Sequence, residues 1–388
     1  MCPGYSGNEW EQKGNPFLKH LADAITVNGW QVVPITREDI RHPGKLIDKG
    51  IDILHLHWPS ALGLMDKYEN YGWSGVSAKS AGKNHPMVKK ILNLIRRIKT
   101  GCDNAFLAKS IIREAKGEIE TWAQEIQNTR IPIVWQQHDL GSHHNQKQGY
   151  ISNIDEMLHR KLYALSTIIA VHEYSCLDAI YDYYGSKKQF VLTPLGPIDY
   201  GSQIPKHLAR ERLGIETKGK VVSYLGTPRG NRNPKKVAEV FFKVSKGEDV
   251  LIVAGQNVKN YLPKSGNKRL NVYDGLLPPE TVRDIYCASD FIVNDAERYL
   301  TSMVVRNAMT YCVPVVVNRF GSSIDMARNA SIFIDGNVAK AIYKALNIND
   351  LEFEQMAAEA AMRHNERSWE RSGKELCGTY EKLMAQTL

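Results

Sequence analysis

Short apolar runs alternate with longer amphipathic stretches along most of the chain. Two of these runs, Phe291–Val293 and Pro314–Val317, are too short and too rich in β-branched residues for helices. Between them, Thr301–Tyr311 has the length of a helix of about three turns. Thr301 and Ser302 stand where helix caps are favoured. The pattern therefore predicts a strand, a loop, a capped helix and a second strand.

Such a unit points the N-terminus of its helix at the carboxyl edge of a parallel sheet. The unpaired N–H groups and the helix dipole at that end attract a phosphate. The same pattern also fits a capped crossover helix that binds nothing. Both interpretations are compatible with the residues.

The first half of the chain repeats the alternation of strand and helix. We expect strands at Trp30–Ile35, Ile51–Trp58, Ile131–Gln137, Ile168–His172 and Phe190–Thr193. We expect helices at Phe17–Val27, after Asn15 and Pro16, at Ile154–Leu165 and at Ser175–Tyr184. Only residues 1–5 precede the first polar loop. Either the first strand is very short or the chain as given lacks part of its natural start.

The second half begins after a break at Pro194-Leu195-Gly196-Pro197. Here we expect strands at Val221–Leu225, Val250–Ala254, Leu270–Tyr273 and Ser331–Ile334, and helices at Pro234–Val244, at Pro279–Ala288, from Val338 and from Asp350. The alternation predicts parallel sheets covered on both faces. We therefore expect two doubly wound, Rossmann-like α/β domains, 1–197 and 198–388, that face each other across a cleft and bind ligands at the carboxyl ends of their strands.

Composition supports a globular protein. The 388 residues are 43% hydrophobic and 24% charged, and no apolar run is long enough to cross a bilayer. The N-terminus lacks the pattern of a secretory signal, and the six cysteines are scattered, which favours reduced thiols in the cytoplasm. The net charge of +8 suggests a polyanionic neighbour.

Much of that charge lies between Lys83 and Lys116, where nine basic residues face only Asp103 and Glu114. Apolar residues are interleaved with them, which predicts a basic amphipathic helix. Such a helix can lie in an anionic membrane interface, and it can equally pack on its own domain. It lacks any accompanying nucleic-acid-reading motif, so we expect no nucleic acid partner.

Several short motifs together resemble one family. They are Gly14-Asn15-Pro16-Phe17, His55-Leu56-His57-Trp58-Pro59, Val134 to Leu140, Thr193 to Gly196, Leu225 to Arg229 followed by Arg232, Val253-Ala254-Gly255, and Leu300-Thr301-Ser302 leading to Ala308-Met309 and Pro314-Val315. Their order and spacing are similar to those of GT-B-fold glycosyltransferases of the nucleotide-sugar-dependent family four, particularly the bacterial exopolysaccharide-type members.

The resemblance implies that the second half binds a nucleoside diphosphate sugar. Arg229 and Arg232 occupy the positions of a basic pair that neutralises the diphosphate, close to Gly226. Thr301 and Ser302 would complete the phosphate cradle. Fixed cations stabilise the charge of a leaving diphosphate, so neither a metal nor another cofactor is expected.

The chain departs from the family at the donor site. Many members carry two glutamates eight positions apart, where this chain has Tyr299 and Asn307. In a subgroup with Leu-Thr-Ser-Gly at this turn, Met303 replaces the glycine. We expect these three residues to line the donor site, without the usual carboxylates.

For the first half, the resemblance implies an acceptor site. It would include Gly14, Asn15, His57 and the aromatic rings of Trp58 and Trp73, which can stack on a sugar or belong to the core. His138 would orient the acceptor hydroxyl or stabilise the transition state. Asp139 would act as a base if the configuration is inverted.

The residues are also compatible with other functions. His55 and His57 lie on one face of a strand and could bind zinc, although no Cys or Glu completes a ligand set. A nucleotide-sugar epimerase, a phosphorylase and a non-catalytic sugar-nucleotide-binding relative are the alternatives on the same scaffold. A dehydrogenase would need a Gly-x-Gly-x-x-Gly turn after a strand, which is missing.

The sequence therefore predicts a hexosyltransferase that takes part in polysaccharide or glycolipid synthesis, with retention favoured by the resemblance. Its acceptor would be a saccharide or a lipid-linked saccharide. We expect it in the cytoplasm, at the inner face of the plasma membrane through the basic helix 83–116.

Overall fold

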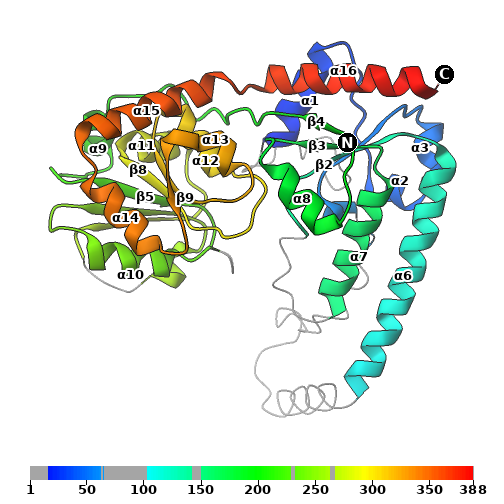
Figure 1. Cartoon of the computed structure of the whole chain (residues 1–388), viewed down its shortest axis with the longest axis horizontal. Coiled ribbons are helices and arrows are strands. Elements are labelled where there is room, and N and C mark those ends of the chain that lie inside the picture. Colours follow the sequence, from blue (N-terminus) through cyan, green and yellow to red (C-terminus); the bar gives the residue numbers. More distant parts are fainter. Residues whose placement is uncertain are drawn as a thin grey trace, which may run out of the picture. The chain divides into compact units, whose positions relative to one another are not determined.

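The computed structural model describes residues 16–62, 64, 103–141, 150–228, 232–262 and 267–387. Its contacts divide the chain into two compact units (Figure 1). Of the described residues, 33–136 and 141–169 belong to the first unit, and 16–32, 137–140 and those from 170 onward to the second. These units are defined by contacts between residues and are not continuous in the sequence. The domain boundary predicted after residue 197 therefore stays a prediction.

The N-terminal sheet has the strand order β1-β2-β3-β4. Its strands are β1 (Leu54–Leu56), β2 (Ile133–Gln136), β3 (Ile168–Val171) and β4 (Phe190–Leu192). β1 runs parallel to β2, with Leu54 opposite Ile133. Every residue of the first three strands is buried, as expected of parallel strands that are covered on both faces.

Helices of the first unit are α2 (Arg37–Arg41), α3 (Gly44–Asp48), η2 (Pro59–Leu62), α6 (Asp103–Thr129) and α7 (Tyr150–Leu165). The long helix α6 packs against α7 and α3. Trp122 on α6 is buried and donates its indole N–H to the carbonyl of Ile40 at 2.9 Å.

The second unit begins with α1 (Phe17–Val27) and continues with α8 (Cys176–Tyr184) after β3 and α9 (Lys206–Arg212) after β4. Its last helices are α15 (Asp350–Asn365) and α16 (Trp369–Thr387), and α16 packs along α1. A Cβ on Gly373 of α16 would lie 2.5 Å from the carbonyl oxygen of Ala24, so the two backbones approach closely where glycine stands.

The C-terminal sheet is parallel throughout and has the order β10-β9-β8-β5-β6-β7. Its strands are β5 (Val221–Leu225), β6 (Val250–Gly255), β7 (Leu270–Asp274), β8 (Phe291–Asn294), β9 (Val315–Asn318) and β10 (Ser331–Ile334). The connections include α10 (Pro234–Val244), η3 (Val258–Tyr261), α11 (Pro279–Ala288), α12 (Met303–Thr310), α13 (Ser323–Ala327) and η4 (Arg328–Ala330), and α14 (Val338–Asn347) follows β10.

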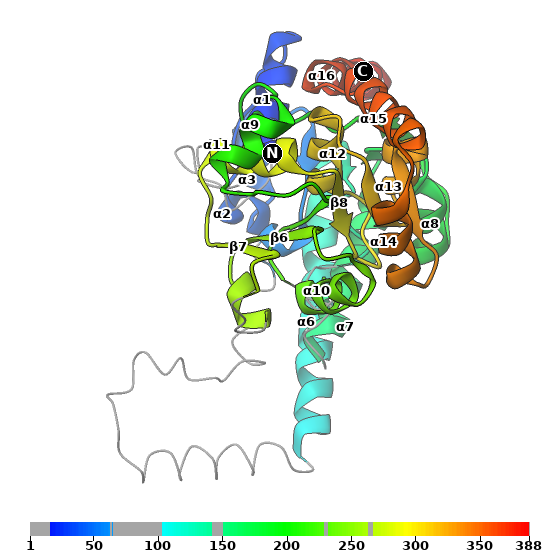
Figure 2. The ribbon, with the colours of Figure 1, turned by 90° about the vertical axis from the view of Figure 1, so that its left-hand side faces the viewer.

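Helices cover both faces of this sheet, as Figure 2 shows from the side. Val222 and Tyr224 of β5 face a core that includes Val237 and Phe241 of α10 and Ile342 of α14. Alternate residues face the other side, where Ser223 Oγ lies 2.5 Å from Ser289 Oγ, just after α11. The central strands are therefore buried on both faces.

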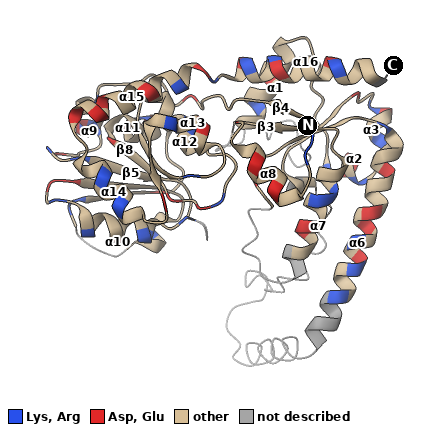
Figure 3. Cartoon of the chain, in the orientation of Figure 1, with Lys and Arg blue, Asp and Glu red and all other residues tan. Residues whose placement is uncertain are grey.

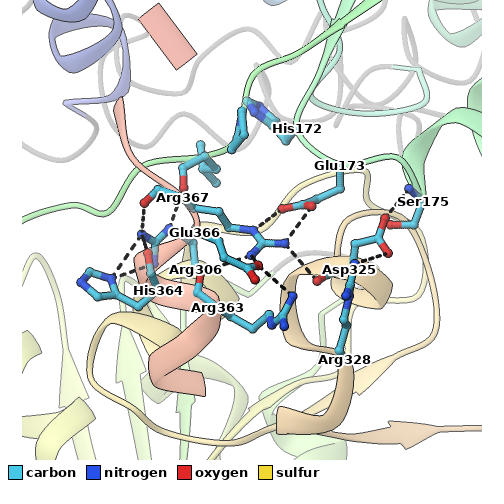
Figure 4. A network of polar contacts seen from close by, with 12 residues as sticks. His172, Glu173, Ser175, Arg306, Asp325, Arg328, Arg363, His364, Glu366 and Arg367 are labelled. Atoms are coloured by element: carbon cyan, nitrogen blue, oxygen red, sulfur yellow. Dashed lines mark hydrogen bonds and ion pairs between the residues drawn. The ribbon is translucent and has the colours of Figure 1, made fainter. Parts of the chain in front are cut away.

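A buried ionic network joins three segments of the second unit that lie far apart in the sequence (Figure 4). Arg367, between α15 and α16, donates to both carboxylate oxygens of Glu173 after β3, at 2.5 and 2.9 Å. The same guanidinium donates to the carbonyl of Asp325 in α13 at 3.0 Å. Asp325 in turn accepts the backbone N–H of Ser175 at 2.8 Å.

Most predicted elements are confirmed, several of them to the residue. The strand predicted at Trp30–Ile35 is wrong, because this segment has no strand assignment and only Ile35 is buried. Pro34 has no N–H to donate to a ladder. The strand predicted at Ile51–Trp58 shortens to Leu54–Leu56, and the helix predicted from Thr301 begins at Met303. The short helices α2, α3, α9 and α13 were not expected.

The predicted basic helix lies largely outside the described residues, which resume at 103. In α6 from residue 109 onward, the basic side chains lie nearer the start of the helix and most of the acidic ones nearer its end (Figure 3). Its apolar residues Ile111, Ile119 and Ile126 are buried within the first unit. Among the helices that the structure describes, none combines the length and apolar character that a membrane-spanning segment requires.

Candidate functional site

In the C-terminal sheet, the direction in which successive strands are added reverses between β5 and β8. The chain runs from β5 outward through β6 to β7, and then returns to the other side of β5 as β8. Doubly wound sheets bind ligands at the carboxyl ends of the strands at such a switch point. Gly226 follows β5 there, and Asp295 follows β8.

Glycines bring the backbone of β5 and β6 close together at this edge. Gly226 and Gly255 have φ values of +128° and +145°, where side chains are strained. A Cβ on Gly255 would collide with the carbonyl oxygen of Gly226. A Cβ on Gly226 would lie 3.0 Å from Nη1 of Arg232. The missing side chain at Gly226 therefore leaves room for the Arg232 guanidinium beside the end of β5.

Asp295 is the neighbouring acidic group and is buried. Its Oδ2 accepts the backbone N–H of Asn233 at 3.2 Å, whereas Oδ1 is buried without a hydrogen-bond partner among the described residues. Burial raises the pKa of Asp295, and the positive charges of Lys236 and Arg232 oppose that shift. Among the described residues, Oδ1 of Asp295 is therefore a hydrogen-bond acceptor without a donor, close to Arg232.

The N-terminus of α12 also lies at this edge. Ser302 is its N-cap, with extended φ and ψ, and its hydroxyl accepts the backbone N–H of Val305 at 3.4 Å and the side-chain amide of Asn294 at 3.0 Å. The first N–H groups of a helix have no intrahelical acceptor. Thr301 precedes the cap, and its Oγ1 is buried with no partner in the part of the chain that the structure describes.

Tyr299 and Asn307 are bound inside the protein. The hydroxyl of Tyr299 is hydrogen-bonded to Ser323, and the side-chain carbonyl of Asn307 accepts the N–H of Ile198 at 3.1 Å. Burial raises the pKa of Tyr299 to about 12, against the Ser323 hydrogen bond and the charge of Arg232. Met303, the first residue of α12, is half-buried. These contacts hold the loop before α12 and the segment after β4 in place.

A second polar group lies at the carboxyl ends of β2 and β3. His138 follows β2, His172 follows β3, and Nδ1 of His138 lies 3.4 Å from Nε2 of His172. The ring of Phe17 in α1 lies nearly perpendicular to both imidazole rings, with centroid distances of 4.9 and 5.9 Å. Asp139, the next residue, is half-buried.

The remaining predicted residues fall in the first unit or outside the described residues. His57 follows β1, its ring stacks on His55 at 4.6 Å, and it lies 5.7 Å from the ring of Trp58. Burial lowers the pKa of His55 to about 3, so it is neutral at physiological pH. The residues outside the description are Gly14, Asn15, Trp73 and Arg229.

The two histidines of the zinc hypothesis share one face, as predicted. Among the residues that the structure describes, no group of three His, Cys, Asp or Glu side chains is arranged to hold a metal ion. The described residues at the β5–β8 edge instead combine the guanidinium of Arg232, the N–H groups at the start of α12 and glycine backbone, which are features typical of anion sites.

No protein-family model and no curated protein matches the chain in sequence. Solved structures do match it. Sucrose-phosphate synthase from Thermosynechococcus elongatus is 13% identical with a TM-score of 0.63, over 100% of this chain and 96% of that one. HepE from Anabaena, in complex with UDP-glucose, is 13% identical with a TM-score of 0.54, over 71% and 82%.

The α,α-trehalose 6-phosphate synthase from Burkholderia multivorans is 12% identical with a TM-score of 0.51, over 69% of this chain and 70% of that one. The chain has the GT-B fold. Its two parallel, doubly wound sheets confirm the predicted α/β class. At these identities the likeness concerns the fold, and the roles of single residues rest on this chain's own geometry.

Sequence reasoning missed two groups that the structure places at the strand ends. Asp295 directly follows the apolar run of β8, and His172 directly follows that of β3. A polar residue at the carboxyl end of a buried parallel strand is the signal that could have found both. His138, which also follows a strand, was expected from the family resemblance.

Proposed function

We propose that the chain is a glycosyltransferase that moves a sugar from a nucleoside diphosphate donor to a saccharide or lipid-linked saccharide. The observation that carries this proposal is the β5–β8 switch point, where Gly226, Arg232 and the N-terminus of α12 meet at one edge. The GT-B fold supports it, since the similar structures include two sugar-phosphate synthases and a UDP-glucose complex.

In this proposal Arg232 holds the diphosphate, with Arg229 as its predicted partner. The N–H groups of Met303 and Val304 complete the cradle. These fixed charges and dipoles stabilise the diphosphate as the bond to the sugar breaks, without a metal or another cofactor. Thr301 Oγ1 and Asp295 Oδ1 are buried and have no hydrogen-bond partner among the described residues. Hydroxyl groups of the donor would supply these partners.

The acceptor would bind at His138 and Asp139, with Gly14, Asn15, His57, Trp58 and Trp73 as further predicted contacts. We place the chain among the exopolysaccharide-type members of family four and expect retention of configuration. Its role would be polysaccharide or glycolipid synthesis in the cytoplasm. The basic segment 83–116 would hold it at the inner face of the plasma membrane.

Release of nucleoside diphosphate tests this function. The protein is incubated with UDP-, GDP- and ADP-sugars and a panel of saccharide acceptors, and the released nucleoside diphosphate is quantified. CMP-sugars, which carry a single phosphate, serve as the control. We expect release with one nucleotide class and at least about a 100-fold loss in Arg232→Ala. Arg269→Ala is the matched control, because Arg269 lies before β7 at the opposite edge of the sheet. Equal activity in both variants would contradict the assigned donor site.

A further inference from the structure

A cavity of about 330 Å³ lies beside β10, the edge strand of the C-terminal sheet. On one face of β10, Ile332 packs into the core that includes Ile342 of α14, whereas Phe333 belongs to the opposite face. Both Ile332 and Phe333 line the cavity, so it follows the edge of β10 that does not pair with β9. None of its lining residues belongs to the β5–β8 edge.

Three basic residues of the described chain line this cavity, which we call the β10 cavity. Lys340 and Lys344 stand four positions apart on α14, so they lie on one face of that helix. Arg319 follows β9 and reaches the Phe333 side of β10. The sequence of α14 contains no acidic residue (Figure 3). Among the described lining residues, Asp335 alone is acidic, so cations outnumber carboxylates.

The guanidinium of Arg319 is held in place by two contacts. Its Cζ lies 3.8 Å from the centroid of the Phe333 ring, and its Nε donates to Oδ1 of Asp335 at 3.3 Å. Its two terminal nitrogens have no acceptor among the described residues. A guanidinium fixed in this way can donate two parallel hydrogen bonds to a phosphate.

The two lysines of the β10 cavity are unpaired in the part of the chain that the structure describes, because neither Nζ contacts a carboxylate or another acceptor there. Other exposed lysines do have such a partner, as Lys19 has in Asp23 at 2.8 Å. Asn337, the N-cap of α14, also lines the cavity and brings the positive end of the helix dipole to it. The cations therefore repel one another, and a bound anion would relieve that repulsion.

We propose that the β10 cavity binds a small polyanion that carries two or more phosphate groups. Phosphate oxygens accept hydrogen bonds from ammonium and guanidinium groups, and a compact polyanion can contact Arg319 and both lysines at once. The volume is near the lower end of small-molecule pockets, about 300–1,000 Å³, which favours a small ligand. This proposal does not depend on the proposed function.

An acidic peptide added as a strand to the edge of β10 is the alternative ligand. The side chains of such a strand would repeat every two residues along β10. Lys340 and Lys344 instead repeat with the period of a helix, on one side of the cavity. The cations thus surround one compact space, which fits a small polyanion better than an extended chain.

Binding of inorganic tripolyphosphate tests the proposal. Calorimetric titrations use the full chain with Arg232→Ala, which removes the cation of the proposed donor edge, in about 0.15 M salt to screen long-range attraction. We expect one saturable site, which Lys340→Ala combined with Lys344→Ala weakens at least about 10-fold. Arg319→Ala should weaken it as well. No saturable binding would overturn the proposal.

The matched control is Lys235→Ala combined with Lys243→Ala, which removes the same charge from α10, the helix packed against α14 (Figure 1). It should change the affinity for tripolyphosphate less than about twofold, because these exposed charges are screened by salt. Equal weakening by the two double variants would show a general charge effect and contradict the β10 cavity as the site.

Protection from acetylation shows where the ligand lies. With saturating tripolyphosphate, Lys340 and Lys344 should be acetylated several-fold more slowly than without it, while Lys243 reacts at an unchanged rate, as measured by mass spectrometry of the peptides. Equal protection of Lys243 would mean non-specific binding to basic surface and would overturn the proposal. Tighter binding of hexaglutamate than of tripolyphosphate would also contradict it and favour addition of a peptide strand.

Discussion

His172 makes the stability of the folded chain depend on pH. Burial lowers its pKa from 6.5 to about 4, so between these values the unfolded chain binds a proton that the folded chain excludes. The stabilisation is present above pH 6.5 and is lost as the pH falls through this window. The neutral ring of His55, with its pKa lowered to about 3, acts in the same direction.

We predict that the free energy of unfolding contains a contribution from His172 that falls by roughly 3 kcal/mol from neutral pH to pH 4. Urea unfolding of wild type and His172→Gln between about pH 7.5 and pH 4 measures it. The wild type should lose stability more steeply than the variant. Parallel pH profiles would show that the protonation of His172 is not linked to folding.

Single residues were predictable from the sequence where their chemistry is local. Ser302 was expected at a cap and is the N-cap of α12, because the hydroxyl bonds to a backbone N–H three residues later. The contact of His138 with His172 was not predictable, since 34 positions separate them and only the pairing of the sheet brings them together. Asp295 was missed because nothing in its local sequence distinguishes it from a solvated loop carboxylate.

At the scale of elements, the carboxyl ends of β5 and β6 depend on two glycines. Gly255→Ala adds a Cβ that collides with the carbonyl of Gly226 in a backbone region that disfavours side chains. We predict a loss of roughly 3 kcal/mol or more in the free energy of unfolding, because the two strand ends must separate. Chemical denaturation measures this loss.

The control for that variant is Gly50→Ala. Gly50 also has a positive φ, +64°, but a Cβ there meets no atom within 4 Å. Its substitution should cost only about 1 kcal/mol of backbone strain. Equal losses at the two positions would mean that the close approach of β5 and β6 does not constrain the site.

Elements were predicted well where a chemical signal marks their ends. Pro234 and Pro279 stand at the first position of α10 and α11, and both helices match the expected bounds. The prediction failed at Trp30–Ile35, where an apolar run resembles a strand but Pro34 cannot join a ladder. Whether an extended segment pairs with another strand depends on the tertiary structure rather than on the composition of the segment.

At the scale of the molecule, the buried pair of Arg367 and Glu173 ties distant segments of the second unit together. Arg367→Ala leaves Glu173 buried without its partner, and we predict a loss of about 3–5 kcal/mol in the free energy of unfolding. The double variant Glu173→Gln with Arg367→Ala should recover part of that loss. Urea unfolding of the four proteins in this cycle gives the coupling energy.

Arg371→Ala is the matched control, because Arg371 is exposed and its guanidinium donates to the carbonyl of Glu366, at 3.0 Å. It should cost less than about 1 kcal/mol. A similar cost for Arg367→Ala would show that the network contributes little.

The pair of Arg367 and Glu173 could not be predicted from the sequence, since 194 positions separate the two residues. The two parallel sheets, in contrast, followed directly from the alternation of strands and helices.

We propose above that the β5–β8 edge binds the diphosphate of a nucleotide sugar. Calorimetric titration of UDP-, GDP- and ADP-sugars into the wild type, Arg232→Ala and Arg269→Ala tests it most directly, with CMP-sugars as the control that carries a single phosphate. We predict saturable binding of one class of nucleoside diphosphate sugar, at least about 10-fold weaker in Arg232→Ala and unchanged in Arg269→Ala. No binding by the wild type, or equal binding by Arg232→Ala, would contradict the account.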